Sequence, residues 1–153
     1  MPDRVVIDTS VFVSAIKSAG GASREVLRLC LAGSCVPLIG HKLFCEYEDV
    51  LGRGGLFNDS LLSEAERMDL LNALLSVTEW VPVFFLWRPN LVDEGDNHLI
   101  ELAVAGAARC IVTHNVRDFR TGELRFPTLE IFTPAQFLAD WRTRHGNDDD
   151  PNT

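Results

Sequence analysis

The chain has 153 residues, 46% of them hydrophobic and 24% charged, which suits one globular domain and is too short for two of ordinary size. Its formal net charge of −8 argues against a broad basic face that would bind nucleic acid without specificity. The four cysteines form no C-x-x-C pair, so neither a zinc ribbon nor a thioredoxin-type site is supported. No apolar run reaches the roughly 18 residues of a membrane span, and the N-terminus lacks the apolar core of a signal peptide. We therefore expect a cytoplasmic protein with no membrane segment.

The first third of the chain alternates short apolar runs with helical periodicities. Ser23 is expected to cap the second helix of this part. In chain order, the predicted elements are a strand over 4–8, a helix from Thr9 or Ser10 to the glycines at 20–21, a helix over 24–33, a strand over 34–40 and a helix over 41–51.

Two capping boxes mark helix starts in the rest of the chain. Ser63 with Glu66 predicts a helix that continues through residue 80, and Thr133 with Gln136 predicts the last helix. Between them we expect a buried strand or extended connector over 81–87, a helix over 97–108 and strands over 110–113 and 129–132. Residues 1–144 are thus predicted to form a single domain, and 145–153 a disordered acidic tail.

Strands separated by helices imply crossover connections and an α/β fold with a mainly parallel sheet covered on both faces. Ligands bind such sheets at the carboxyl ends of the strands. Asp8 directly follows the first strand, and Asn115 and Asp118 follow the strand over 110–113. These positions are therefore the first candidates for a functional site.

Each acidic candidate also has a purely structural interpretation. Asp8 and Asp96 stand where an aspartate commonly caps a helix, and Asp118 is a possible turn residue. Glu46 and Glu48 border the apolar face of the helix over 41–51 on opposite sides, and the periodicity does not choose between them.

Together, carboxylates at one end of a sheet indicate a metal site more specifically than any one of them does. Without a cation they would repel one another, whereas Mg²⁺ or Mn²⁺ turns this repulsion into coordination. Such a cluster suits phosphodiester hydrolysis. The chain has no Walker A motif, no G-x-G-x-x-G and no G-x-S-x-G, so the corresponding nucleotide-binding and esterase classes lose their usual signatures.

Four segments of the chain resemble the PIN-domain family, in particular its toxin components of toxin–antitoxin modules. They are VVIDTSVFVSAI, LFCEYEDVL, DEGDNHLIELAVAGAARCIVTHNVRDF and LEIFTPAQFL, in the family's order over roughly residues 4–140. The resemblance implies a three-layer α/β/α sandwich with a mainly parallel central sheet. It also implies a Mg²⁺- or Mn²⁺-dependent nuclease acting on single-stranded RNA, a cognate antitoxin and a possible homodimer.

The resemblance also implies roles for individual residues. It favours Glu46 over Glu48, and it places Asn97 where many members carry the acid that we assign to Asp96. His98 and His114 are expected to be bystanders. The implied catalytic and metal-binding residues are Asp8, Glu46, Asp96 and Asp118, the implied supporting residues are Ser10, Asn97, Thr113 and Asn115, and the weaker candidates for RNA contact are Arg117 and Arg120.

Three alternatives stay open at this level. Asn97 and Asn115 leave open the first alternative, a catalytically degenerate PIN-like module that binds RNA or a partner protein without cutting RNA. A phosphotransfer domain with Asp8 as phosphoacceptor is disfavoured, because such sites commonly use a later lysine and none follows Lys42. A structural or regulatory partner protein is the third alternative.

Overall fold

Five parallel strands form the centre of the computed structural model, which describes residues 2–18, 20–58, 60, 62–83, 97–120 and 129–146. The strands lie in the order β3-β2-β1-β4-β5, and every neighbouring pair is parallel. Their bounds are β1 Asp3–Ile7, β2 Cys35–Ile39, β3 Glu79–Trp80, β4 Cys110–Val112 and β5 Glu130–Phe132. The prediction of a mainly parallel sheet is confirmed.

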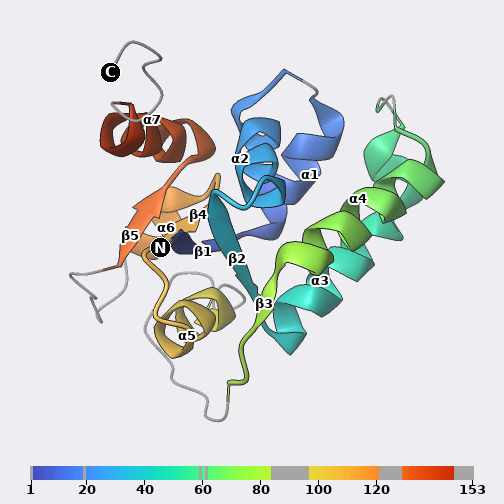
Figure 1. Ribbon diagram of the computed structural model, residues 1–153. Helices are drawn as coiled ribbons and strands as arrows, with labels where there is room; N and C mark the ends of the chain where they lie inside the picture. The colour runs from blue at the N-terminus through green and yellow to red at the C-terminus, as the bar shows by residue number, and fades with distance from the viewer. Residues whose placement is uncertain are drawn as a thin grey trace.

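Helices cover both faces of this sheet. In Figure 1, α1, α2 and α7 lie on one side of it and α5 on the other, which is the predicted three-layer α/β/α arrangement. Helix α3 packs against α1, α4 and α5. The helices are α1 Thr9–Lys17, α2 Ala22–Leu31, α3 His41–Leu51, α4 Glu64–Val77, α5 Asn97–Ala105, α6 Val116–Arg120 and α7 Pro134–His145, with a short 3-10 helix η1 Gly54–Phe57 after α3.

The order of the strands reverses beside β1. From β1 the chain proceeds outward to β2 and β3, and it then returns to place β4 on the other side of β1 and β5 beyond it. Such a switch point opens a crevice at the carboxyl ends of the two strands concerned. The residues that follow Ile7 and Val112 are therefore the candidates for a ligand-binding site.

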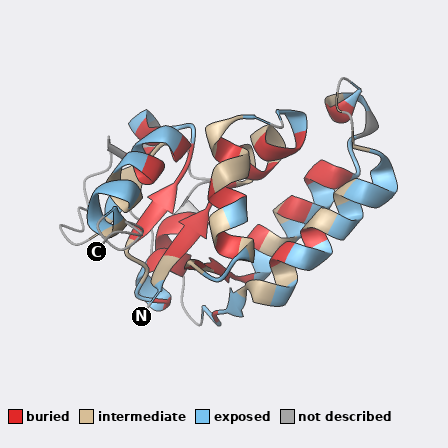
Figure 2. Cartoon of the chain, turned by 45° about the horizontal axis from the view of Figure 1, so that its top comes forward, coloured by how far each residue is buried: buried red, intermediate tan, exposed pale blue. Residues whose placement is uncertain are grey.

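The core is built from the strands and from the inward faces of the helices. Figure 2 shows buried residues along the sheet and exposed residues on the outer helical faces. Val5 and Val6 in β1 are fully buried, as expected for a strand with helices on both sides. Phe12 of α1 and Phe137 of α7 are also fully buried. No helix in the described ranges is long and apolar enough to cross a bilayer.

The close packing of α5 depends on a glycine just beyond its last residue. A Cβ atom at Gly106 would lie 2.6 Å from Leu38 Cδ1 and 3.1 Å from Val81 Cγ2. The small residue therefore lets the end of α5 approach β2 and the segment after β3.

Both predicted capping boxes are confirmed. The Ser63 hydroxyl accepts a hydrogen bond from the Glu66 backbone N–H, and the Glu66 side chain accepts one from the Ser63 backbone N–H. Thr133 and Gln136 make the same reciprocal pair, with Pro134 in the first turn of α7. The two partners of a capping box are only three positions apart, so the motif can be predicted without tertiary information.

Three local expectations were wrong. Gly21 rather than Ser23 precedes α2, and the Ser23 side chain is buried 3.1 Å from His114 Nε2. Helix α4 ends at Val77 instead of continuing to residue 80, because Glu79 and Trp80 pair with β2. Residues 116–120 form the short helix α6, so the interpretation of Asp118 as a turn residue was wrong.

The remaining expectations concern the connector and the tail. Residues 81–83 carry no regular secondary structure, and 84–87 of the predicted strand or connector lie outside the described residues. Helix α7 continues through His145, while residues 147–153 of the predicted tail lie outside the described residues.

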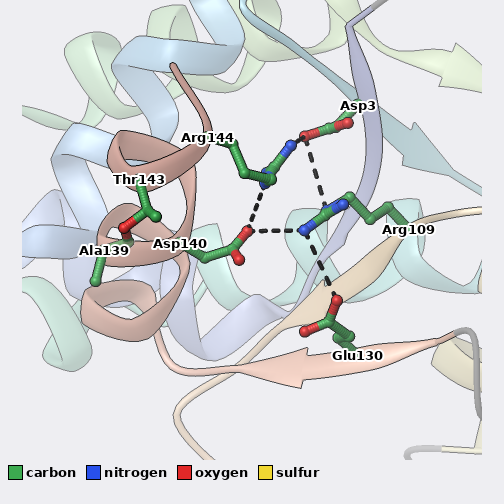
Figure 3. A network of polar contacts seen from close by, with 7 residues as sticks. All are labelled: Asp3, Arg109, Glu130, Ala139, Asp140, Thr143 and Arg144. Atoms are coloured by element: carbon green, nitrogen blue, oxygen red, sulfur yellow. Dashed lines mark hydrogen bonds and ion pairs between the residues drawn. The ribbon is translucent and has the colours of Figure 1, made fainter. Parts of the chain in front are cut away.

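A network of charges closes the amino end of the sheet (Figure 3). Asp140 of α7 accepts hydrogen bonds from Arg144 Nε at 2.8 Å and Arg109 Nη2 at 2.9 Å. Arg144 Nη1 also lies 2.6 Å from Asp3 Oδ2, and Arg109 Nη2 lies 3.7 Å from Glu130 Oε1. The network thus joins α7 to the starts of β1 and β5 and to the residue that precedes β4.

Asp140→Asn is expected to lower the free energy of unfolding at neutral pH by about 1 kcal/mol. Burial alone would raise the pKa of Asp140, but the two arginines outweigh it and hold the pKa below its ordinary value. The stabilisation is present above the unfolded-state pKa of about 3.9 and is lost as the pH falls through the lower native pKa. Denaturant unfolding of the wild type and of Asp140→Asn between pH 2 and 7 measures how their difference in free energy of unfolding depends on pH. Asp69→Asn, at an exposed position of α4, is the control.

Candidate active site

Asp8 stands at the switch point, directly after β1. It occupies the N-cap position of α1, but its side chain makes no capping hydrogen bond. Instead, Oδ2 accepts hydrogen bonds from Thr113 Oγ1 at 2.7 Å and from Ser10 Oγ at 3.0 Å. The carboxylate, only 5% exposed, is therefore held by the end of β4 and by a side chain of α1, and not by a capping bond from a backbone N–H.

Thr113 links the ends of the two central strands. It is fully buried, and its hydroxyl oxygen accepts a hydrogen bond from the Asn115 backbone N–H at 3.0 Å while donating to Asp8. The Asp8 backbone N–H also donates to Val112 O at 2.9 Å. On the other side, Ser10 Oγ accepts from the His114 backbone N–H at 3.3 Å. Thr113 and Ser10, which donate to the Asp8 carboxylate, are thus fixed by hydrogen bonds of their own.

Thr113→Val is expected to lower the free energy of unfolding by about 1–3 kcal/mol, because it removes a donor from a buried carboxylate and an acceptor from the Asn115 N–H. Thr113→Ser keeps the hydroxyl and is the matched control. Chemical denaturation of both variants measures the difference. Equal stability of the two variants would contradict a structural contribution of the hydroxyl.

Glu46 approaches the same region from the middle of α3. Its Oε2 accepts a hydrogen bond from Thr9 Oγ1 at 3.1 Å, and its Oε1 lies 3.0 Å from His98 Nε2. The His98 contact has the distance but not the angle of a hydrogen bond, so it is a close polar contact. Thr9 is the residue after Asp8, so the Glu46 carboxylate contacts the chain next to the first candidate.

The charge state of Glu46 follows from these contacts. Partial burial raises the pKa of Glu46, but the polar contact with His98, the hydrogen bond from Thr9 and the charge of Lys42 outweigh it and lower the pKa below its ordinary value. Glu46 is therefore an ionised carboxylate at neutral pH. Its side chain is 37% exposed, whereas Glu48 lies among the exposed residues of α3, away from these contacts.

Tyr47 and His98 are contributors that the sequence did not single out. The buried Tyr47 hydroxyl donates a hydrogen bond to Ile7 O at 2.5 Å, which ties α3 to the end of β1. Burial, followed by the negative charge of Asp8, raises the pKa of Tyr47, so the phenol keeps the proton that it donates. His98, expected to be a bystander, is 8% exposed and contacts Glu46. His114 instead contacts Ser23.

The other predicted site residues are placed only in part. Asn115 and Arg117 are exposed after β4. Asn97 begins α5, and Asp118 and Arg120 belong to α6, but the side chains of all three lie outside the description. Asp96 lies outside the described residues altogether. The structure therefore brings together Asp8, Ser10, Thr113 and Glu46.

A divalent cation suits the chemistry of this donor set. Within the described part of the chain, no ion pair involves Asp8, and both side-chain hydrogen bonds to it end on Oδ2. A buried carboxylate without a cationic partner is costly, and its second oxygen is a hard ligand of the kind Mg²⁺ and Mn²⁺ take. The described residues contain no group of three or more potential ligands placed to hold a metal.

Comparison with known proteins gives a family match and a likeness to solved structures. The family model for the PIN domain matches residues 4–117. A chain in the crystal structure of VapBC2 from Rickettsia felis, bound to a DNA fragment from their promoter, aligns with a TM-score of 0.55 and 17% sequence identity. The alignment covers 84% of the present chain and 96% of that chain. No match was found among curated proteins. At this identity the likeness shows a common fold.

Proposed function

Because the chain belongs to the PIN-domain family, we propose that it is a metal-dependent endoribonuclease that hydrolyses phosphodiester bonds of single-stranded RNA. The observation that carries the proposal is the buried Asp8 carboxylate at the switch point of a parallel sheet, with the ionised Glu46 approaching from α3. This is the end of the sheet at which α/β proteins bind their ligands.

Asp8, Glu46, Asp96 and Asp118 are the proposed metal ligands. Mg²⁺ or Mn²⁺, when bound, supplies Lewis-acid activation of water and neutralises charge on the phosphate. Asp8 supplies a carboxylate that Thr113 and Ser10 hold in one orientation. Asn97 and Asn115 are proposed as supporting polar groups near these ligands.

Further roles are proposed for side chains near the scissile phosphate. Glu46, kept ionised by His98, Thr9 and Lys42, completes the ligand set or accepts a proton from the attacking water. Arg117, exposed after β4, and Arg120 are proposed to contact the RNA backbone.

We also propose that the protein is the toxin of a toxin–antitoxin pair, with a cognate antitoxin and a homodimeric state. The Rickettsia felis structure supports a partner protein, because it holds the VapBC2 complex on promoter DNA. The proposed location is the cytoplasm, where an RNA substrate is available.

The test is cleavage of a labelled single-stranded RNA by purified protein in Mg²⁺ or Mn²⁺, in EDTA, and with single-stranded DNA of the same sequence. We expect cleavage of RNA only, and only with metal. A folded protein that binds RNA without cutting it under any of these conditions would instead favour the catalytically degenerate module.

The identity of the third acidic ligand is tested by neighbouring substitutions. Asp96→Asn is expected to reduce cleavage by roughly 10²-fold or more, because it removes a ligand charge from the proposed site. Asn97→Ala, one residue away, is expected to retain most of the activity. The reverse pattern in the same RNA assay would assign the ligand position to Asn97.

A further inference from the structure

We propose that the pocket between the start of α3, the end of β3 and α5 binds one base of the single-stranded RNA beside the candidate active site. This inference rests on the proposed nuclease function and deepens it by naming a substrate subsite. The pocket has a volume of about 440 Å³, which is within the range of small-molecule sites. The lining residues that carry the argument are Lys42, Trp80, Val81, His98, Glu101 and Leu102.

The pocket shares a wall with the candidate active site. His98 lines the pocket and also lies 3.0 Å from Glu46 Oε1. Lys42 lines it as well, stands one helical turn before Glu46 on α3, and its charge contributes to the low pKa of Glu46. Trp80 ends β3, which runs parallel to β2 and β1, so it lies at the same edge of the sheet as Asp8. A polynucleotide at Glu46 therefore passes the mouth of this pocket.

Trp80 offers a surface suited to a base. Its side chain is 52% exposed, while most large apolar side chains among the described residues are buried. On one side it packs against Phe44, with ring centroids 5.4 Å apart and planes inclined by 57°. Phe44 thereby supports the indole ring while about half of its surface stays open. Single-stranded RNA is commonly recognised by unpaired bases that stack on such aromatic side chains.

The charges indicate which part of a nucleotide enters. Lys42 is one of only two lysines in a chain of net charge −8, and it is exposed beside the pocket. Deeper in the wall, Glu101 is 9% exposed and stands beside the apolar Leu102. A carboxylate and apolar walls disfavour a phosphate and accept a base with N–H donors. The base therefore points inward, and its phosphate lies toward Lys42, the cationic side chain of the lining.

The test is equilibrium binding of a fluorescent single-stranded RNA in Mg²⁺, with Asp8→Asn as the parent so that RNA is not consumed. Adding Trp80→Ala is expected to weaken binding about 5- to 150-fold, since stacking of one base contributes roughly 1–3 kcal/mol. Trp80→Phe keeps an aromatic ring and should retain most of the affinity. Met68→Ala removes another exposed apolar side chain, 42% exposed on α4, and should change nothing.

Substrate variants then identify what Trp80 contacts. A set of RNAs carries one abasic nucleotide at successive positions. At one position, the abasic change should weaken binding to the parent but not to the Trp80→Ala protein, because the partner of the missing base is already gone. Lys42→Gln should weaken binding to all RNAs about equally and reduce its salt dependence.

Two results would overturn the subsite. One is unchanged binding after Trp80→Ala in a protein with the parent's melting temperature. The other is weaker binding with the same abasic profile as the parent, which would mean that Trp80 contacts no base of the RNA. Suppose that the wild type cuts no RNA while one abasic position still weakens binding only when Trp80 is present. In that case the nuclease proposal fails and the base-binding site remains. If Trp80→Ala does not fold, Trp80→Leu takes its place in both measurements, because it also removes the aromatic ring and fills more of the same space.

Discussion

Asp8→Asn is expected to abolish metal-dependent cleavage of RNA, with a loss of at least about 10²-fold in kcat. The substitution keeps the size of the side chain and an oxygen that can accept hydrogen bonds from Thr113 and Ser10. It removes the negative charge that, on our proposal, binds the divalent cation. Initial rates on labelled RNA at saturating Mn²⁺ measure the effect.

The same variant separates loss of function from loss of fold. Asp8 is 5% exposed, so removing its charge relieves a desolvation cost, and the melting temperature in EDTA should equal or exceed that of the wild type. Mn²⁺ should raise the melting temperature of the wild type, because a ligand that binds only the native state stabilises it, and this shift should vanish in Asp8→Asn. An Mn²⁺-dependent shift of normal size in the variant would contradict the assignment of Asp8 as a metal ligand.

Glu46→Gln is expected to lower kcat by roughly 10²- to 10⁴-fold, as for loss of a general base or of a ligand charge. Glutamine keeps an oxygen that can accept from Thr9 Oγ1, so the local structure around α3 should persist. Glu46 carries its charge at neutral pH because the surrounding polar contacts lower its pKa despite partial burial. Steady-state kinetics on the same RNA measure the change.

Glu48→Gln is the matched control, two residues further along α3. It makes the same chemical change at an exposed position, so kcat is expected to stay within about twofold of the wild type, as for a surface substitution away from special features. Similar losses in both variants would mean that general negative charge on α3, rather than the Glu46 position, supports the activity.

Much of the fold was predictable because its signals are local. The valines and isoleucine of β1 form a continuous apolar run, as expected for a strand buried on both faces. The capping boxes at Ser63 and Thr133 satisfy the first backbone N–H groups of their helices within four residues. Such features need no information from distant parts of the chain.

The errors arose where a distant segment competed with a local preference. Ser23 is a good capping residue by type, but its buried hydroxyl lies beside His114, which is 91 residues away. Helical periodicity ran on toward Trp80, but the edge of β2 offered backbone partners that end the helix at Val77. Pairing across the sheet decided that boundary.

By itself, the sequence determined that the chain would form helices between parallel strands, because apolar periodicity and capping are properties of neighbouring residues. It also brought Asp8 to the end of the first strand. Only the tertiary structure decided that Thr113 would hold Asp8 across 105 positions, and that Glu46 rather than Glu48 would meet Thr9 and His98. These pairings depend on strand order and on the rotation of α3 against α1 and α5, which are set by packing between elements.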